Sequence, residues 1–348
     1  MSTAPAVRKV EPRAAQPLLS VRDLRTYFHT PRGIAKAVDG VSFSVEAGKT
    51  LAIVGESGCG KSVTALSIIQ LLAEPAGYVE SGEVWFDGQD LLALSREQIR
   101  AYRGRRIGMV FQEPMTSLNP VFTIGRQVIE GMEVHGIARG KQAWSRAVEL
   151  LDRVGIQEPA MVMNRYPHEL SGGMRQRVMI AGALACSPDL LIADEPTTAL
   201  DVTVQAQILA LLAELQRELG MAMLLITHDL GIVAEMADDV AVMYAGQMVE
   251  TAPARELYRA PQHPYTRALF ASLPSRQSRG QDLMTIEGRV PDATAWPPGC
   301  RFADRCPERF EPCPTTPPQL AEVRPGHEAR CLLHPECFPA AVPGEGSR

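Results

Sequence analysis

Gly55-Glu-Ser-Gly-Cys-Gly-Lys61-Ser62 is the stretch of sequence from which the fold can be worked out. It follows the short apolar run Thr50–Val54 and precedes a helical pattern over residues 62–72. The glycines let successive backbone N–H groups curl around phosphate oxygens, and the start of a helix adds a partial positive charge. The stretch therefore predicts a phosphate-binding loop between a buried strand and a helix.

The residue types in this loop predict its contacts with a nucleotide. Lys61 is expected to reach the β- and γ-phosphates, and Ser62 is expected to hold Mg²⁺ through its hydroxyl. The remaining loop residues expected to bind the nucleotide are Gly55, Ser57, Gly58, Gly60 and Val63. The glycine spacing differs from G-x-G-x-x-G, which disfavours a dinucleotide site.

A second stretch, Leu190-Leu-Ile-Ala-Asp194-Glu195, supplies two carboxylates at the end of an apolar strand. Asp194 is expected to enter the Mg²⁺ shell, and Glu195 is placed to polarise an attacking water. Such a pair alone would usually be a solvated turn. Together with the phosphate-binding loop, it predicts nucleotide hydrolysis.

Strand and helix signals alternate along much of the chain. Further buried strands are expected at 107–111, 190–193, 223–226 and 240–243, and helices at 203–219 and 230–236. Residues 18–45 look like antiparallel strands, with turns at Pro31-Arg-Gly33 and Asp39-Gly40. Helical spacing without strand signals marks an insertion over 120–165. The pattern predicts an α/β fold with a mostly parallel sheet covered by helices.

Composition limits the classes of protein that remain. The 348 residues are 45% hydrophobic, which is ample for a core, and the formal net charge is -5. That charge disfavours a large basic surface for nucleic acid. The N-terminal residues 1–16 lack the apolar core of a signal peptide, and no apolar run approaches the roughly 20 residues that cross a bilayer. A soluble chain in the cytoplasm is expected.

Leu170-Ser-Gly-Gly-Met-Arg-Gln-Arg177 precedes the strand that ends in Asp194. A serine and two glycines open a helix over 174–184, which leaves N–H groups and a positive dipole end facing outward. At this segment the chain resembles the ATP-binding subunits of ABC transporters, with Ser171, Gly172 and Gly173 similar to their signature motif. The resemblance implies that the signature motif of one subunit closes over ATP held by the other.

Further motifs of that family occur in the same order. Gln112 looks like the glutamine that senses Mg²⁺ and the γ-phosphate, and Ala199-Leu-Asp201 resembles the loop that crosses the dimer interface. His228 resembles the switch histidine at the γ-phosphate. Phe28 looks like the aromatic residue that stacks on adenine, with Tyr27 as the fallback. Because no motif is degenerate, Lys61, Gln112, Glu195 and His228 are expected to support catalysis.

Two stretches narrow the resemblance. Gln112-Glu-Pro-Met-Thr-Ser-Leu-Asn-Pro120 and His263-Pro-Tyr-Thr266 are similar to the dipeptide and oligopeptide import subfamily, which includes nickel importers. The resemblance implies an ATPase that drives alternating access in two membrane subunits, with peptide delivered by an extracytoplasmic binding protein. Nickel remains the alternative cargo. Residues 113–170 are the expected docking surface for a membrane subunit.

The resemblance also implies a location and a partner. The chain is expected at the cytoplasmic face of the inner membrane as a peripheral subunit, paired with a second ATP-binding subunit, with a heterodimer preferred. A DNA-repair ATPase of the same superfamily would need a long coiled-coil arm or a basic face, and residues 113–170 are too short for such an arm. A translation-associated ATPase usually carries two cassettes, and one is present here.

Five of the seven cysteines lie in a proline-rich tail, and four of them are candidate ligands: Cys300, Cys306, Cys313 and Cys331. Their gaps are wider than those of zinc knuckles and tolerable for a cubane whose irons each need one thiolate. The spacing alone leaves a cluster, zinc and free thiols open. The subfamily's C-terminal extension has this pattern and implies a [4Fe–4S] cluster, which would act as a structural staple for the tail. Cys337 is expected to be uninvolved.

The sequence thus divides into four parts. Residues 1–17 form an expected disordered leader, and residues 18–112 with 171–258 form the ATP-binding core with its antiparallel β subdomain. Residues 113–170 form the helical subdomain, and residues 259–348 form the cysteine-rich C-terminal extension.

Overall fold

The computed structural model describes residues 16–113, 117–197, 200–272 and 286–339. The predicted leader lies almost entirely outside these residues, and Ala199 of the predicted interface loop lies outside them too. Among the described residues, no helix is both long enough and apolar enough to cross a membrane.

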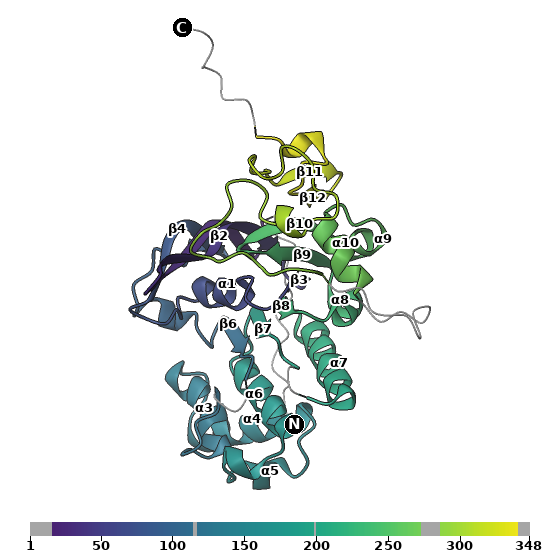
Figure 1. Ribbon diagram of the computed structural model, residues 1–348. Coiled ribbons are helices and arrows are strands. Elements are labelled where there is room, and N and C mark those ends of the chain that lie inside the picture. The colour runs from purple at the N-terminus through teal and green to yellow at the C-terminus, as the bar shows by residue number, and fades with distance from the viewer. Residues whose placement is uncertain (1–15, 114–116, 198–199, 273–285, 340–348) are drawn as a thin grey trace.

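A large mixed sheet forms the centre of the fold (Figure 1). Its strands are β3 (Thr50–Val54), β6 (Ile107–Val110), β7 (Leu190–Asp194), β8 (Ala222–Thr227), β9 (Asp239–Tyr244), β10 (Gln247–Pro253), β11 (Ala321–Arg324) and β12 (His327–Ala329). The spatial order is β11-β12-β10-β9-β3-β8-β7-β6. The five strands from β9 to β6 are parallel, and the other three are antiparallel. The predicted parallel strands are therefore confirmed.

A smaller antiparallel sheet lies beside it. It contains β1 (Leu19–Thr30), β2 (Gly33–Val45), β4 (Gly77–Phe86) and β5 (Gln89–Asp90), in the order β2-β1-β4-β5. The predicted turn at Asp39-Gly40 is wrong, because Asp39 pairs with Arg25 inside β2. Gly40, at a φ of 82°, sits in a register shift of the ladder. A bulge of this kind takes up the unusual backbone without ending the strand.

Helices cover the parallel strands. They are α1 (Lys61–Ile68), α6 (Gly172–Leu184), α7 (Val202–Leu219) and α8 (Leu230–Met236). The helix predicted over 62–72 is shorter in the structure, because Gln70 adopts a left-handed φ of 52°. Its side-chain amide instead donates to the carbonyl of Leu91 at 2.5 Å. A contact distant in sequence therefore ends this helix.

The predicted helical insertion is confirmed and lies at one end of the molecule (Figure 1). It contains α3 (Ile124–Val134), α4 (Gly140–Arg153) and α5 (Pro159–Val162). Val128, Met132, Leu151 and Val154 recur at helical spacing and are buried in one cluster with residues of α6. The apolar face of the insertion is thus packed against the signature helix.

The C-terminal segment lies at the opposite end and continues the large sheet (Figure 1). After α9 (Ala254–Arg259) and α10 (Pro264–Ala271), the chain returns as β11 and β12, and β12 pairs with β10. Phe302 is 1% exposed, and its ring centroid lies 5.3 Å from that of Tyr244 and 5.4 Å from that of Tyr265. The sequence predicts that a metal cluster is needed to stabilise the tail. The structure shows that packing against the core of the cassette stabilises it.

Replacing Phe302 by alanine should destabilise the whole cassette. The loss of a fully buried aromatic side chain lowers the free energy of unfolding by about 3–5 kcal/mol. Urea denaturation followed by circular dichroism measures this change. Phe338→Ala, at a site 41% exposed, is the matched control and should change little. A tail that melts alone while the cassette keeps its full stability would contradict the shared core.

Candidate nucleotide-binding site

Most of the residues predicted to bind and hydrolyse a nucleotide come together at the carboxyl ends of four neighbouring parallel strands. The strands are ordered β3-β8-β7-β6. The phosphate-binding loop follows β3, His228 follows β8, Asp194 and Glu195 end β7, and Gln112 follows β6. The carboxyl edge of a parallel sheet is where ligands bind in open α/β folds.

The loop fits closely against both sheets because two of its glycines lack a Cβ. A Cβ on Gly55 would lie 2.1 Å from the carbonyl oxygen of Met243, in β9. A Cβ on Gly60 would lie 2.4 Å from the carbonyl oxygen of Ala37, in β2. Gly60 also has a φ of 111°, which side chains other than hydrogen rarely allow. The curled loop therefore requires glycine at both positions.

Lys61 is folded back over this loop. Its ammonium donates to the carbonyl oxygens of Gly55 at 2.9 Å and Glu56 at 3.1 Å, and the side chain is buried. These bonds hold a positive charge against the loop, where phosphate groups would bind. Ser57 and Gly58 are exposed at the tip of the loop, and Val63 is half-buried on α1.

Ser62 and Asp194 form the pair expected at Mg²⁺. The Ser62 hydroxyl donates to Asp194 Oδ1 at 3.0 Å. Burial raises the pKa of Asp194, the charge of Glu195 raises it further, and the bond from Ser62 opposes the shift. A hydroxyl and a buried carboxylate are hard oxygen ligands of the type that Mg²⁺ takes, and a cation would stabilise the ionised carboxylate. The pair therefore fits a magnesium ion.

Glu195 is the point on which two other predicted residues converge. Gln112 Nε2 donates to Glu195 Oε2 at 2.9 Å, and His228 Nδ1 lies 3.4 Å from Glu195 Oε1. The backbone of Glu195 has a φ of 45°, and its N–H donates to the carbonyl of Ile226 in β8. The carboxylate is therefore fixed by strands on both sides of β7.

The signature residues occupy a different surface. Ser171 caps α6, and its Oγ accepts from the N–H of Met174 at 3.3 Å. Ser171 and Gly172 are exposed, while Gly173 packs so closely that a Cβ there would lie 2.9 Å from Val204. Asp201 caps α7 and accepts from the N–H of Val204 at 2.9 Å. Val204 thus links the starts of α6 and α7.

The two aromatic residues proposed for adenine differ in orientation. The Tyr27 hydroxyl donates to Asp39 Oδ1 at 2.9 Å, and the ring is buried. Tyr27 is therefore poorly placed as the fallback. Phe28 is half-buried and covers Gly77, where a Cβ would lie 2.6 Å from the ring. Phe28 pairs with Ala35, two residues along β2 from the residue that contacts Gly60.

Cys300, Cys306, Cys313 and Cys331 line one small cavity, the four-cysteine cavity. Burial and the neighbouring thiols raise the pKa of Cys300 to about 11 and that of Cys331 to about 12. In the part of the chain that the structure describes, no group of three or more His, Cys, Asp or Glu residues is placed to hold a metal ion. These residues therefore support neither the expected [4Fe–4S] cluster nor the zinc alternative.

The structure adds one residue to the site that sequence reasoning missed. The N–H of Glu56, in the phosphate-binding loop, donates to the hydroxyl of Tyr265 at 3.0 Å. Tyr265 belongs to His263-Pro-Tyr-Thr266, a stretch that the sequence marks only by its similarity to the peptide import subfamily. The two residues are 209 positions apart, so no local pattern could have joined them.

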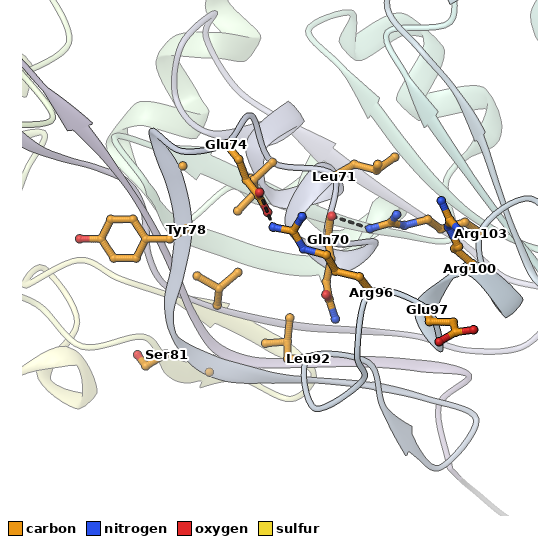
Figure 2. A pocket seen from close by; sticks show the side chains of 14 residues that line it. Gln70, Leu71, Glu74, Tyr78, Ser81, Leu92, Arg96, Glu97, Arg100 and Arg103 are labelled. Carbon is orange, nitrogen blue, oxygen red and sulfur yellow. Dashed lines mark hydrogen bonds and ion pairs between the residues drawn. The ribbon is translucent and has the colours of Figure 1, made fainter.

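A large open pocket lies elsewhere and contains none of the predicted site residues. It measures about 1060 Å³ and lies between β4 and the segment that follows α1. Within this pocket Arg96 forms an ion pair with Glu74, and the guanidinium of Arg103 donates to the carbonyl of Gln70 at 2.5 Å (Figure 2). The size of this pocket does not make it the nucleotide site, because the groups suited to a nucleotide lie at the carboxyl ends of the parallel strands.

Comparisons with known proteins agree with this geometry. Residues 38–198 match the family described as "ABC transporter", and residues 249–313 match "Oligopeptide/dipeptide transporter, C-terminal region". A solved dimeric ATP-binding cassette, in a post-hydrolysis state with ADP and Pi, is 28% identical with a TM-score of 0.62. The match covers 68% of this chain and 99% of that one.

Two curated relatives match along nearly their whole length. A probable peptide ABC transporter ATP-binding protein of Sinorhizobium fredii is 53% identical, over 90% of this chain and 94% of its own. The oligopeptide transport ATP-binding protein AppD of Bacillus subtilis is 49% identical, over 92% of this chain and 97% of its own. With these identities and this strand-end site, the chain belongs to the family of ATP-binding subunits of peptide ABC transporters.

Proposed function

We propose that this chain hydrolyses ATP to drive uptake of peptides through a membrane importer. One observation carries the proposal: the Ser62–Asp194 pair adjoins a Glu195 carboxylate that contacts both Gln112 and His228. The names of the relatives favour peptide over nickel as the cargo.

The loop and its lysine bind the phosphates. Backbone N–H groups between Gly55 and Ser62 donate to phosphate oxygens, and Lys61 exchanges its loop carbonyls for the β- and γ-phosphates. Ser62 and Asp194, with Gln112 nearby, would hold Mg²⁺. When bound, that ion neutralises charge on the phosphate oxygens. Phe28 covers the adenine end of the nucleotide.

Glu195 orients the attacking water and accepts its proton. The water oxygen bonds to the γ-phosphorus, the bond to the β-γ bridging oxygen breaks, and ADP and phosphate leave. Gln112 and His228 contact the two carboxylate oxygens of Glu195. Both must release or share Glu195 when water and the γ-phosphate arrive, so they report nucleotide occupancy to the catalytic carboxylate.

A second ATP-binding subunit completes the site. Ser171 and Gly172 present the exposed positive end of α6 to the surface, which suits the phosphates of ATP held by a partner. Asp201 lies at the adjoining start of α7. The solved dimeric relative supports pairing of two cassettes. We favour a related but different subunit as the partner.

Replacing Glu195 by glutamine should abolish turnover while leaving nucleotide binding intact. Loss of a general base reduces kcat by about 10²- to 10⁴-fold, because glutamine cannot accept the proton. Phosphate release and MgATP titration measure the two properties. Glu214→Gln, an exposed position on α7, is the matched control.

Dimerisation of the Glu195→Gln variant identifies the partner. With MgATP, size-exclusion chromatography should show a closed dimer when the related subunit is present. A dimer of the purified chain alone would instead establish self-association. Near-normal turnover in the variant would exclude Glu195 as the base.

We propose further that residues 113–170 dock a membrane subunit at the cytoplasmic face of the inner membrane. Within this segment several apolar side chains are exposed: Val121, Phe122, Val134, Trp144 and Met161. Adjacent exposed apolar side chains, such as Val121 and Phe122, suit an interaction surface. In the complete importer an extracytoplasmic binding protein would deliver peptide to two such membrane subunits.

A charged side chain introduced at this surface should disrupt assembly of the importer. Val121 is 70% exposed, so Val121→Asp leaves the cassette folded but places a carboxylate in the proposed interface. Co-purification with the membrane subunits should fall by at least about tenfold, while basal ATP binding is retained. Phe338→Asp, outside the segment, is the control. Intact assembly and transport in the Val121 variant, and in charge reversals across 113–170, would remove this docking surface.

We propose that the four-cysteine cavity takes a [4Fe–4S] cluster. Four half-buried or buried thiols line one cavity, and their raised pKa values mean that thiolates there need a compensating positive charge. A cluster would supply that charge through its irons and use one thiolate from each cysteine.

Anaerobic purification tests this cavity. The chain should contain about four irons and four sulfides, and Cys306→Ser should lower both. Cys337→Ser is the control, because the Cys337 thiol is buried and donates to the carbonyl of Ala329. A colourless protein with stoichiometric zinc would contradict the cluster.

A further inference from the structure

Glu56, the second residue of the phosphate-binding loop, is held by two side chains from the C-terminal segment. The hydroxyl of Tyr265 accepts from the N–H of Glu56 at 3.0 Å. The guanidinium of Arg305 donates to Glu56 Oε2 at 3.1 Å. Lys61 binds the carbonyl oxygen of the same residue. Amide, carbonyl and carboxylate of one loop residue are therefore all engaged.

Arg305 is fixed in position by contacts on every side of its guanidinium. The side chain is 6% exposed. Its Nε donates to the carbonyl of Glu287 at 2.9 Å, and its Nη2 donates to that of Ile286 at 3.2 Å. Nη1 also lies 3.3 Å from the hydroxyl of Tyr244. A planar donor group held in this way offers its charge at one defined place.

Tyr265 is fixed by packing and by a buried polar network. It is fully buried, with its ring centroid 4.6 Å from that of Tyr244. Its N–H donates to His263 Nδ1, and the N–H of His263 donates to the buried carboxylate of Glu250. The network places the phenol hydroxyl under the loop with little freedom to move.

The charge of Glu56 explains why this support matters for a nucleotide. A carboxylate in a phosphate-binding loop repels the anionic phosphates unless a cation neutralises it. Glu56 Oε1 is buried and has no hydrogen-bond partner among the described residues, so the ion pair between Arg305 and Glu56 Oε2 is the main compensation for this charge. Without Arg305, an uncompensated negative charge would face incoming ATP.

We infer that Arg305 and Tyr265 are positioning residues for ATP binding. Arg305 neutralises Glu56, and Tyr265 fixes the loop amide, so the C-terminal segment sets the affinity of the phosphate-binding loop. This inference rests on the proposed function, since it takes ATP as the ligand of the loop. Both residues adjoin the wall of the four-cysteine cavity, because Pro264 and Cys306 line it. The residues that support the phosphate-binding loop are therefore chain neighbours of residues that line this cavity.

A double-mutant cycle on the full-length chain tests the electrostatic part. In MgATP titration calorimetry, Arg305→Gln should raise Kd about tenfold, within the usual range for coupling between sites. Glu56→Gln should bind at least as well as the unmodified chain. The double variant Glu56→Gln/Arg305→Gln should recover most of the lost affinity, because it removes the uncompensated charge together with its partner. A merely structural defect would not be rescued in this way.

Ionic strength and a conservative substitution separate charge from packing. The loss in Arg305→Gln should shrink as salt rises, since salt screens the repulsion between Glu56 and the phosphates. Arg305→Lys keeps the charge and should lose less affinity than Arg305→Gln. Tyr265→Phe should raise Kd about two- to tenfold without this salt dependence, because it removes one neutral hydrogen bond.

Arg309→Gln is the matched control, because Arg309 pairs with Asp304 at the surface of the same segment. It should keep the Kd of the unmodified chain. Equal losses in the glutamine and lysine variants at position 305, or a double variant as weak as Arg305→Gln, would overturn the inference. An unchanged Kd in Arg305→Gln would overturn it alone. Failure of the unmodified chain to bind MgATP would overturn the proposed function as well.

Discussion

The close contact of the phosphate-binding loop with two sheets is the constraint on which the rest of the structure depends. Gly55 lies against the carbonyl of Met243 in the large sheet, and Gly60 lies against that of Ala37 in the small one. Side chains at either position would push the loop out of this gap. The two sheets therefore hold between them a loop of backbone amides, which is the surface that we propose binds phosphate.

The parallel strands then bring the chemical groups to the same edge. Ser62 and Asp194 meet across β8, although they are 132 residues apart, and Glu195 receives Gln112 and His228 from either side. Burial disfavours the ionised form of Asp194 and raises its pKa. A cation beside this carboxylate would favour the ionised form.

The C-terminal segment is an integral part of the cassette. It adds β11 and β12 to the edge of the large sheet and inserts Phe302 into the core. From the same segment, Arg305 reaches the loop residue Glu56. Phe302, which lines the four-cysteine cavity, packs against Tyr265, and the hydroxyl of Tyr265 bonds to the loop residue Glu56.

The sequence by itself determined what local chemistry can express. The order strand, glycine loop, helix predicted a phosphate site, and the paired carboxylates after 190–193 predicted a hydrolytic one. Apolar runs located the parallel strands. These features can be predicted from the sequence because turn residues and hydrophobic periodicity act over only a few residues. Tertiary structure alone decided where α1 ends and that Asp39 stays inside β2. It also decided that Tyr27 is buried with its hydroxyl on Asp39, and that Arg305 pairs with Glu56, 249 residues away in the chain. Those outcomes depend on which distant surfaces pack together, and no local pattern carries that information.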